Sequence, residues 1–184
     1  MDTSHIGHER AGGYPVVFIT DTTLRETGRL IASFAEREPS EGIVYWFGLE
    51  QASCAIVTTL VVPDADTSTG AVRTSALANA QALSVAVGTP LVLLGQAHSH
   101  PGCNVSHSSV DDRDTFARYD GSLSLVVPYF GWYGVKLPDC GLYRHVEGRF
   151  RRIAPERFGE HLVVFPGSAD FRRLGHTEAT ECTR

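Results

Sequence analysis

Three side chains in the middle of the chain have the types and spacing of a metal site. His98 and His100 follow closely after the apolar run of residues 91–94, and Asp111 comes soon after them. Two imidazoles and one carboxylate can hold a catalytic zinc ion while its fourth position stays open for water. Ser108 offers a hydroxyl beside this set. Nothing else in the sequence points so directly to chemistry.

The elements around these residues are expected to turn them toward one ion. Residues 91–97 predict a short strand that is buried on both faces. Alternate side chains on extended backbone point the same way, so His98 and His100 can face the same ion. Ser108 is expected to cap a helix that runs to about residue 119, which places Asp111 on the same face one turn later. Without a metal, these residues would be a helix cap, a first-turn carboxylate and two loop histidines.

The rest of the chain predicts an α+β domain, in which helices flank a mixed sheet. Asp21 is the expected N-cap of a first helix that runs to about Glu38, and Pro39 ends that helix. Residues 63–70 are expected to form a loop and residues 74–87 a second helix. The expected strands are residues 16–19, 42–49, 54–62, 91–97, 123–128, 141–146 and 150–153.

Composition limits the class of protein. The chain has 184 residues, of which 42% are hydrophobic, so it can bury the core of one domain. We expect that domain over residues 14–167, with a disordered tail at 1–13 and a flexible one at 168–184. The net charge of −5 argues against a nucleic-acid partner. No apolar run is long enough to span a membrane, there is no secretory signal, and the four cysteines form no Cys-x-x-Cys pair, so a reduced, cytoplasmic protein is expected.

The motif resembles that of a known enzyme family. The run His98-Ser99-His100-Pro101, followed by Ser108-Ser109-Val110-Asp111, matches the JAMM (MPN+) zinc metalloprotease motif at every defining position. That family also carries an upstream glutamate in the pattern Glu-x-x-Gly-x-Leu-x-Gly. Here Glu41 and Gly48 have the matching separation, while Val44 replaces the middle glycine. The resemblance extends over about residues 15–155.

This resemblance implies a fold and a set of roles. The fold would be MPN-like, also described as cytidine-deaminase-like. His98, His100 and Asp111 would hold one Zn²⁺, which makes water a nucleophile near neutral pH. Glu41 would take up the water proton and pass it to the leaving amine. Ser108 would donate a hydrogen bond to the oxyanion.

The resemblance also implies a substrate class. Family members cleave isopeptide or peptide bonds after the C-terminal tail of ubiquitin or a ubiquitin-like protein. The expected setting is a bacterial ubiquitin-like conjugation pathway, with activating and conjugating enzymes as further partners and antiphage defence as one role. A peptidase acting on a sulfur-carrier protein in cysteine or cofactor synthesis is the first alternative. A non-catalytic MPN scaffold is an alternative of another class, and the intact site residues argue against it.

Three neighbouring features have open roles. Cys103 could be an extra ligand or redox brake, but a partly buried small residue is the simpler expectation. His107 could contact substrate or support the site, but a surface-loop histidine is the simpler expectation. The segment 128–134 carries four aromatic residues in a glycine-rich stretch. These could bind a partner, although core positions are slightly favoured.

Overall fold

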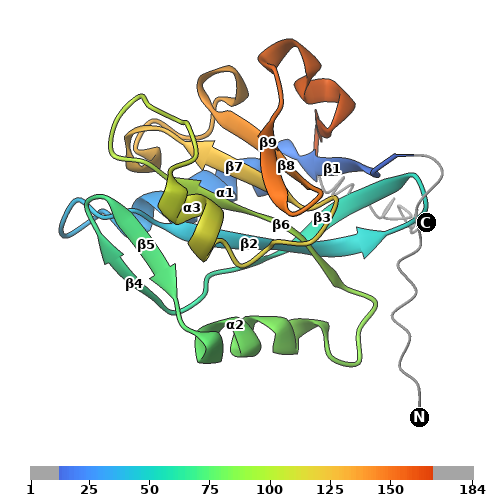
Figure 1. Cartoon of the computed structure of the whole chain (residues 1–184), viewed down its shortest axis with the longest axis horizontal. Helices are drawn as coiled ribbons and strands as arrows, with labels where there is room; N and C mark the ends of the chain where they lie inside the picture. Colours follow the sequence, from blue (N-terminus) through green and yellow to red (C-terminus); the bar gives the residue numbers. More distant parts are fainter. Residues whose placement is uncertain (1–12, 168–184) are drawn as a thin grey trace, which may run out of the picture.

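The computed structural model describes residues 13–167, which fold around an eight-stranded sheet (Figure 1). The strands run across it in the order β10-β1-β3-β2-β6-β7-β8-β9, and β4 pairs with β5 separately. The strands are β1 (Val16–Thr20), β2 (Ile43–Glu50), β3 (Cys54–Val61), β4 (Ala65–Ser68), β5 (Ala71–Thr74), β6 (Val92–Ser99), β7 (Leu123–Val127), β8 (Gly141–Val146), β9 (Arg149–Arg152) and β10 (Leu162–Phe165). The helices are α1 (Asp21–Ser33), α2 (Ala76–Leu83) and α3 (Ser109–Asp114), with short 3-10 turns η1 (Ser84–Ala86), η2 (Tyr129–Gly131), η3 (Leu137–Asp139) and η4 (Pro155–Glu160).

The large sheet mixes parallel and antiparallel pairs. β1 runs parallel to both β10 and β3, and β6 runs parallel to β7. The pairs β2–β3, β2–β6, β7–β8 and β8–β9 are antiparallel. The predicted α+β domain with a mixed sheet and flanking helices is therefore confirmed. The two expected tails lie outside the described residues, apart from Gly13, so their character stays a prediction.

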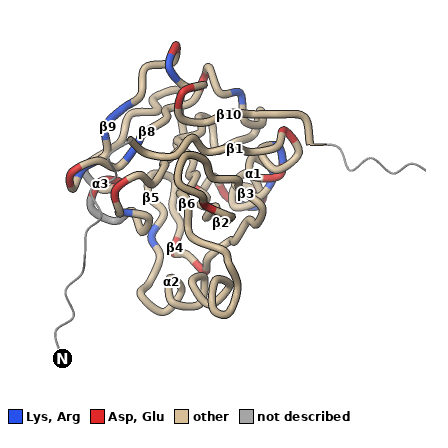
Figure 2. Tube along the Cα trace, turned by 90° about the vertical axis from the view of Figure 1, so that its right-hand side faces the viewer, with Lys and Arg blue, Asp and Glu red and all other residues tan. Residues whose placement is uncertain are grey.

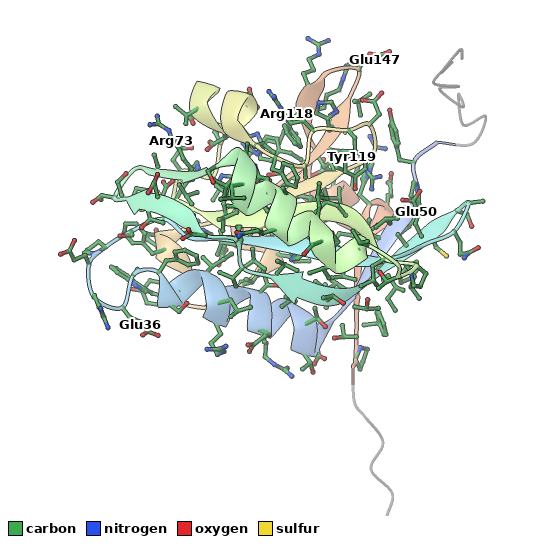
Figure 3. The ribbon with its side chains drawn as sticks, turned by 90° about the horizontal axis from the view of Figure 1, so that it is seen from below. Glu36, Glu50, Arg73, Arg118, Tyr119 and Glu147 are labelled. Carbon is green, nitrogen blue, oxygen red and sulfur yellow. The ribbon has the colours of Figure 1, made fainter. Side chains whose placement is uncertain are left out.

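Strand β2 explains why the sheet is covered on both faces. Val44 and Trp46 pack into the core cluster that α1 covers with Leu24 and Ile31. The alternate residues Ile43, Tyr45 and Phe47 pack into a second cluster with Ala82 of α2. Because neighbouring side chains of a strand point to opposite faces, an uninterrupted apolar run fits a strand buried on both sides. Figure 3 shows α2 lying across the sheet when the molecule is seen from below.

Helix α1 begins and ends earlier than the sequence predicted. Its N-cap is Thr20, whose hydroxyl oxygen accepts a hydrogen bond from the Thr23 amide at 2.9 Å. Asp21 was expected to be the cap, but its carboxylate accepts from the Gly167 amide at 2.9 Å. The helix ends at Ser33, where Phe34 is the C-cap, instead of near residue 38. Gly167 is distant from Asp21 in sequence, so local spacing could not reveal this contact.

Three strands were not predicted. Residues 63–70 were expected to be a loop, but β4 and β5 form a hairpin whose register pairs Ser68 with Ala71. The hairpin packs on the second core cluster through Ala65 and Val72, and the Ser68 carbonyl accepts from the Glu41 amide at 2.9 Å. β10 pairs with β1 and so extends the sheet at that edge. Both elements depend on long-range partners that a local pattern does not contain.

Helix α3 is much shorter than expected, because it spans Ser109–Asp114 and not residues up to about 119. Thr115 leaves the helical region with φ −57° and ψ 129°. Its hydroxyl donates to the Asp111 carbonyl and accepts from the Gln96 side-chain amide at 3.4 Å. The buried Gln96 of β6 thus fixes the end of the helix against the sheet.

The surface carries charges of both signs. Lys and Arg are interspersed with Asp and Glu along the trace, as Figure 2 shows. Ion pairs on α1, such as Arg25 with Asp21 at 3.0 Å, are exposed and contribute little to stability. Among residues 13–167, no helix combines the length and apolar character needed to cross a bilayer.

Candidate metal centre

The three predicted ligands come together at the end of β6. Donor atoms of His98, His100 and Asp111 all lie within 4.8 Å of one another. The Nε2 atom of His98 is 3.5 Å from Asp111 Oδ1, and Nε2 of His100 is 3.3 Å from Asp111 Oδ2. The strand end and the helix start therefore meet as the spacing predicted, with two imidazoles and one carboxylate turned inward.

The surroundings of both imidazoles suit a bound cation. His100 Nδ1 lies 2.8 Å from the Asn104 carbonyl, which can only accept, so Nδ1 donates and Nε2 is left to face Asp111. His98 is only 2% exposed, yet neither of its ring nitrogens has a hydrogen-bond partner. A buried polar atom without a partner is costly. Coordination of a metal ion by one of these nitrogens would give that atom a partner, so the residues present fit such an ion.

Ser108 and Asp111 form a reciprocal helix cap. The Asp111 amide donates to Ser108 Oγ at 3.1 Å, and the Ser108 amide donates to Asp111 Oδ2 at 2.6 Å. The predicted N-cap is thus confirmed, and the cap uses only the acceptor side of the Ser108 hydroxyl. Burial opposes ionisation of Asp111, but its interactions with the nearby His100 and His98 rings hold its pKa well below its usual range. Asp111 is therefore a carboxylate across the physiological range.

Glu41 lies at the same edge, although it is far from the histidines in sequence. Ile43 pairs with His98 across β2 and β6, and the Gly42 amide donates to Ser99 Oγ at 2.9 Å. Continuing this antiparallel register brings Glu41 beside His100. Glu41 is 4% exposed, and burial raises the pKa of its carboxyl to about 7, with Asp111 raising it further and His100 opposing. A carboxyl group that titrates near neutrality suits proton transfer.

Gly48 and Val44 show how β2, the strand that follows Glu41, is packed. A Cβ at Gly48 would lie 1.9 Å from the Ile56 carbonyl oxygen, so the backbones of β2 and β3 approach too closely for any other residue. Val44, which replaces the middle glycine of the family pattern, is fully buried in the core cluster under α1. Its methyl groups fill that core on the face of β2 opposite to Ile43.

His107 was expected to be a surface-loop histidine, and this expectation is wrong. Its side chain is 4% exposed, and its ring stacks on Tyr143 with 3.9 Å between ring centroids. Burial lowers the pKa of His107 to about 4, with His98 lowering it further, so the ring is neutral at pH 7. Tyr143 also donates to the Val105 carbonyl at 3.0 Å and accepts from the His107 amide at 3.1 Å. Tyr143 lies far along the chain, and no local signal marks it as a support of the site.

Cys103 and the aromatic segment also differ from the expectation. Cys103 is exposed, not partly buried. Phe130 is buried, as expected for a core residue, but Tyr129, Trp132 and Tyr133 are exposed. The segment lies close to the metal ligands, because the Phe130 amide donates to the His100 carbonyl at 2.8 Å.

A larger concave surface lies at the other end of β6. It has a volume of about 1250 Å³ and includes Leu93 and Leu94 among its lining residues. Glu50, Tyr119 and Glu147 also line it, and Figure 3 labels them. Since the metal ligands lie at the opposite end of the strand, this groove is separate from the candidate site.

Comparisons with known proteins point in the same direction. The chain is 36% identical over 108 residues to a protein named "Probable metalloprotease y4jG" from Sinorhizobium fredii. The match covers 56% of this chain and 66% of the relative, slightly less than two thirds of its length. The resemblance to metalloproteases that the motif indicated is thereby confirmed. No family model matches the chain.

Solved structures share the fold at low sequence identity. Protein DSY2949 from Desulfitobacterium hafniense matches with a TM-score of 0.63 and 14% identity, over 83% of this chain and 94% of that chain. A protein from Salinibacter ruber matches at 0.53 and 16% identity, over 74% and 88%. A JAB1/MPN domain protein from Archaeoglobus fulgidus, AF2198, matches at 0.46 and 16% identity, over 80% and 96%. The two structures with TM-scores of 0.63 and 0.53 show that the fold is shared.

Proposed function

We propose that the chain is a zinc-dependent peptidase or isopeptidase that cleaves after the C-terminal tail of a ubiquitin-like protein. The observation that carries this proposal is Glu41, a buried carboxyl with a pKa of about 7 beside His98, His100 and Asp111. A proton carrier next to two imidazoles and a carboxylate is the donor set of a hydrolytic zinc site. A structural metal site has no need for such a group.

The residues of the site have three different roles in this proposal. His98, His100 and Asp111 would hold the ion, which supplies Lewis acidity and an activated water when bound. Glu41 accepts a proton and returns it to the leaving amine, as its pKa near neutrality favours. The Ser108 hydroxyl keeps its proton free of the helix cap and donates it to the oxyanion of the tetrahedral intermediate.

The β4–β5 hairpin lies beside the metal ligands. A cavity of about 20 Å³ is lined by His98 and Asp111 together with Val72 and Thr74 of β5. In the described part of the chain, β4 and β5 form a sheet of their own, and we infer that an extended substrate tail binds beside this hairpin as an added strand.

The proposed substrate implies the pathway in which the protein acts. A protease of this specificity would mature a ubiquitin-like precursor and remove it from targets, in a cytoplasmic bacterial conjugation pathway. Its partners would include the activating and conjugating enzymes, with antiphage defence as one role. A sulfur-carrier protein also ends in an extended tail and is the second candidate substrate. Incubation with each carrier protein, extended at its C-terminus, separates the two.

The test uses the zinc-loaded chain and a ubiquitin-like protein whose glycine tail carries a C-terminal extension. We expect cleavage after the tail, inhibition by a chelator, and loss of activity in Glu41→Gln with zinc content unchanged. Glu50→Gln is the matched control, because it makes the same chemical change at the other end of β2 and should retain activity. Cleavage by Glu41→Gln at the native rate would refute the mechanism. A zinc-loaded chain that cleaves neither carrier would favour the scaffold alternative.

A further inference from the structure

His107 connects four elements that surround the metal centre. Its Nδ1 lies 3.0 Å from the Asp112 carboxylate of α3, and its Nε2 lies 3.0 Å from the Ser124 hydroxyl of β7. Since a carboxylate can only accept, Nδ1 donates to Asp112 and Nε2 accepts from Ser124. The ring also stacks on Tyr143 of β8 and meets the edge of Phe150 of β9. Every polar atom of the imidazole is therefore used.

His107 and its partner Asp112 are each adjacent in sequence to a residue of the site. His107 directly precedes Ser108, and its partner Asp112 directly follows the ligand Asp111. Its ring centroid lies 5.7 Å from that of His98. Helix α3 has only six residues, and a helix this short does not hold its orientation unaided. Bonds from outside the helix must fix the direction of its first turn.

We propose that His107 is a positioning residue, which fixes Ser108 and Asp111 relative to the histidine pair by tying α3 to β7 and β8. It acts through its neighbours and does not touch the ion or the substrate. The inference rests on the proposed function only in requiring a metal ion at the centre. Groups that orient the ligands of a metal typically account for 10-fold to 100-fold in affinity or activity.

The chain contains a matched control for this role. His145 is also buried, lies 3.1 Å from a carboxylate, that of Asp120, and meets the edge of Phe150 at 5.1 Å. It lies toward the other end of β8, because Arg144 pairs with Leu123 while Gly141 pairs with Val126 near the metal ligands. His107→Ala and His145→Ala should therefore lose similar stability, but only the first should disturb the metal centre.

The experiment measures cobalt binding to both variants and to the unchanged chain, together with their thermal unfolding. We expect His107→Ala to bind Co²⁺ about 10-fold to 100-fold more weakly, with an altered visible absorption spectrum, while His145→Ala matches the unchanged chain. Steady-state kinetics at saturating metal should show a lower kcat with little change in KM for His107→Ala. Native cobalt affinity and spectrum in a folded His107→Ala protein would overturn the proposal.

Asp112 provides a second route if His107→Ala fails to fold. The Asp112 side chain is more than half exposed, so its replacement should leave the core intact. Asp112→Asn keeps an acceptor for His107 Nδ1 and removes the charge, whereas Asp112→Ala removes both. Weaker cobalt binding in Asp112→Ala than in Asp112→Asn supports the proposal, and equal binding refutes it. Because cobalt binding needs no substrate, a chain that binds metal but cleaves nothing would refute the proposed function alone.

Discussion

Replacement of Glu41 by glutamine should stabilise the metal-free protein above pH 7 while it abolishes hydrolysis. Burial raises the pKa of this carboxyl from 4.5 to about 7, because the charged form is desolvated. Folding at high pH must therefore bury a charge that His100 offsets only in part. Glutamine has nearly the same shape and carries no charge, so this cost disappears.

The magnitude follows from the shift in pKa. The favourable contribution of a group whose folded pKa is raised is fully present below the unfolded value of 4.5 and is lost as pH rises through about 7. At about 1.4 kcal/mol per pH unit, the rise in pKa from 4.5 to about 7 gives a loss that approaches about 3.5 kcal/mol above pH 7. For a domain of this size, that difference corresponds to roughly 7–14 °C in Tm.

The assay is urea or thermal unfolding of both proteins in the presence of a chelator, from pH 4.5 to pH 8. Glu41→Gln should match the unchanged chain at pH 4.5 and exceed it progressively toward pH 8. Added zinc should reduce the difference, because a cation beside Glu41 stabilises the carboxylate. A stability difference that does not vary with pH, or a variant less stable at pH 8, would refute the reasoning.

Two further predictions test the packing and the surface around the site. Gly48→Ala should destabilise the fold by about 1–3 kcal/mol or more, because its Cβ would strike the Ile56 carbonyl. Gly70→Ala, where a Cβ meets open space, should change the unfolding midpoint in urea very little. Trp132→Ala should raise KM for a protein substrate about 10-fold but leave KM for a short peptide unchanged. Equal effects on both substrates would contradict a role for this exposed side chain, and fluorescence quenching on binding offers a direct check, since Trp46 is fully buried.

The sequence predicted those residues of the site whose positions depend on local spacing. His98 and His100 share a face because the strand is extended there, and Ser108 caps a helix that carries Asp111 in its first turn. Glu41 lies far away in sequence. Only the resemblance to a family pattern identified it, because its place beside His100 depends on the register of β2 against β6.

The missed features depend on partners that are remote in sequence. His107 is buried because Tyr143 and Phe150 enclose its ring, and both come from strands formed later in the chain. The β4–β5 hairpin has only four residues in each strand and no clear apolar alternation. Its existence depends on packing against the second core cluster, to which Tyr45 and Phe47 belong. Hydrophobic periodicity therefore predicted only those elements whose own sequence shows which side chains are buried.

The turn after β7 connects the outer surface directly to a metal ligand. Tyr129 and Phe130 both adopt left-handed backbone conformations, with φ of 54° and 55°, which cost non-glycine residues about 1–2 kcal/mol each. Glycine would fit this bend more easily, yet two aromatic residues occupy it, of which Tyr129 is exposed and Phe130 is buried. The Phe130 amide at the centre of the bend holds the His100 carbonyl. A partner that binds the exposed ring of Tyr129 would therefore contact the chain only one residue away from that hydrogen bond.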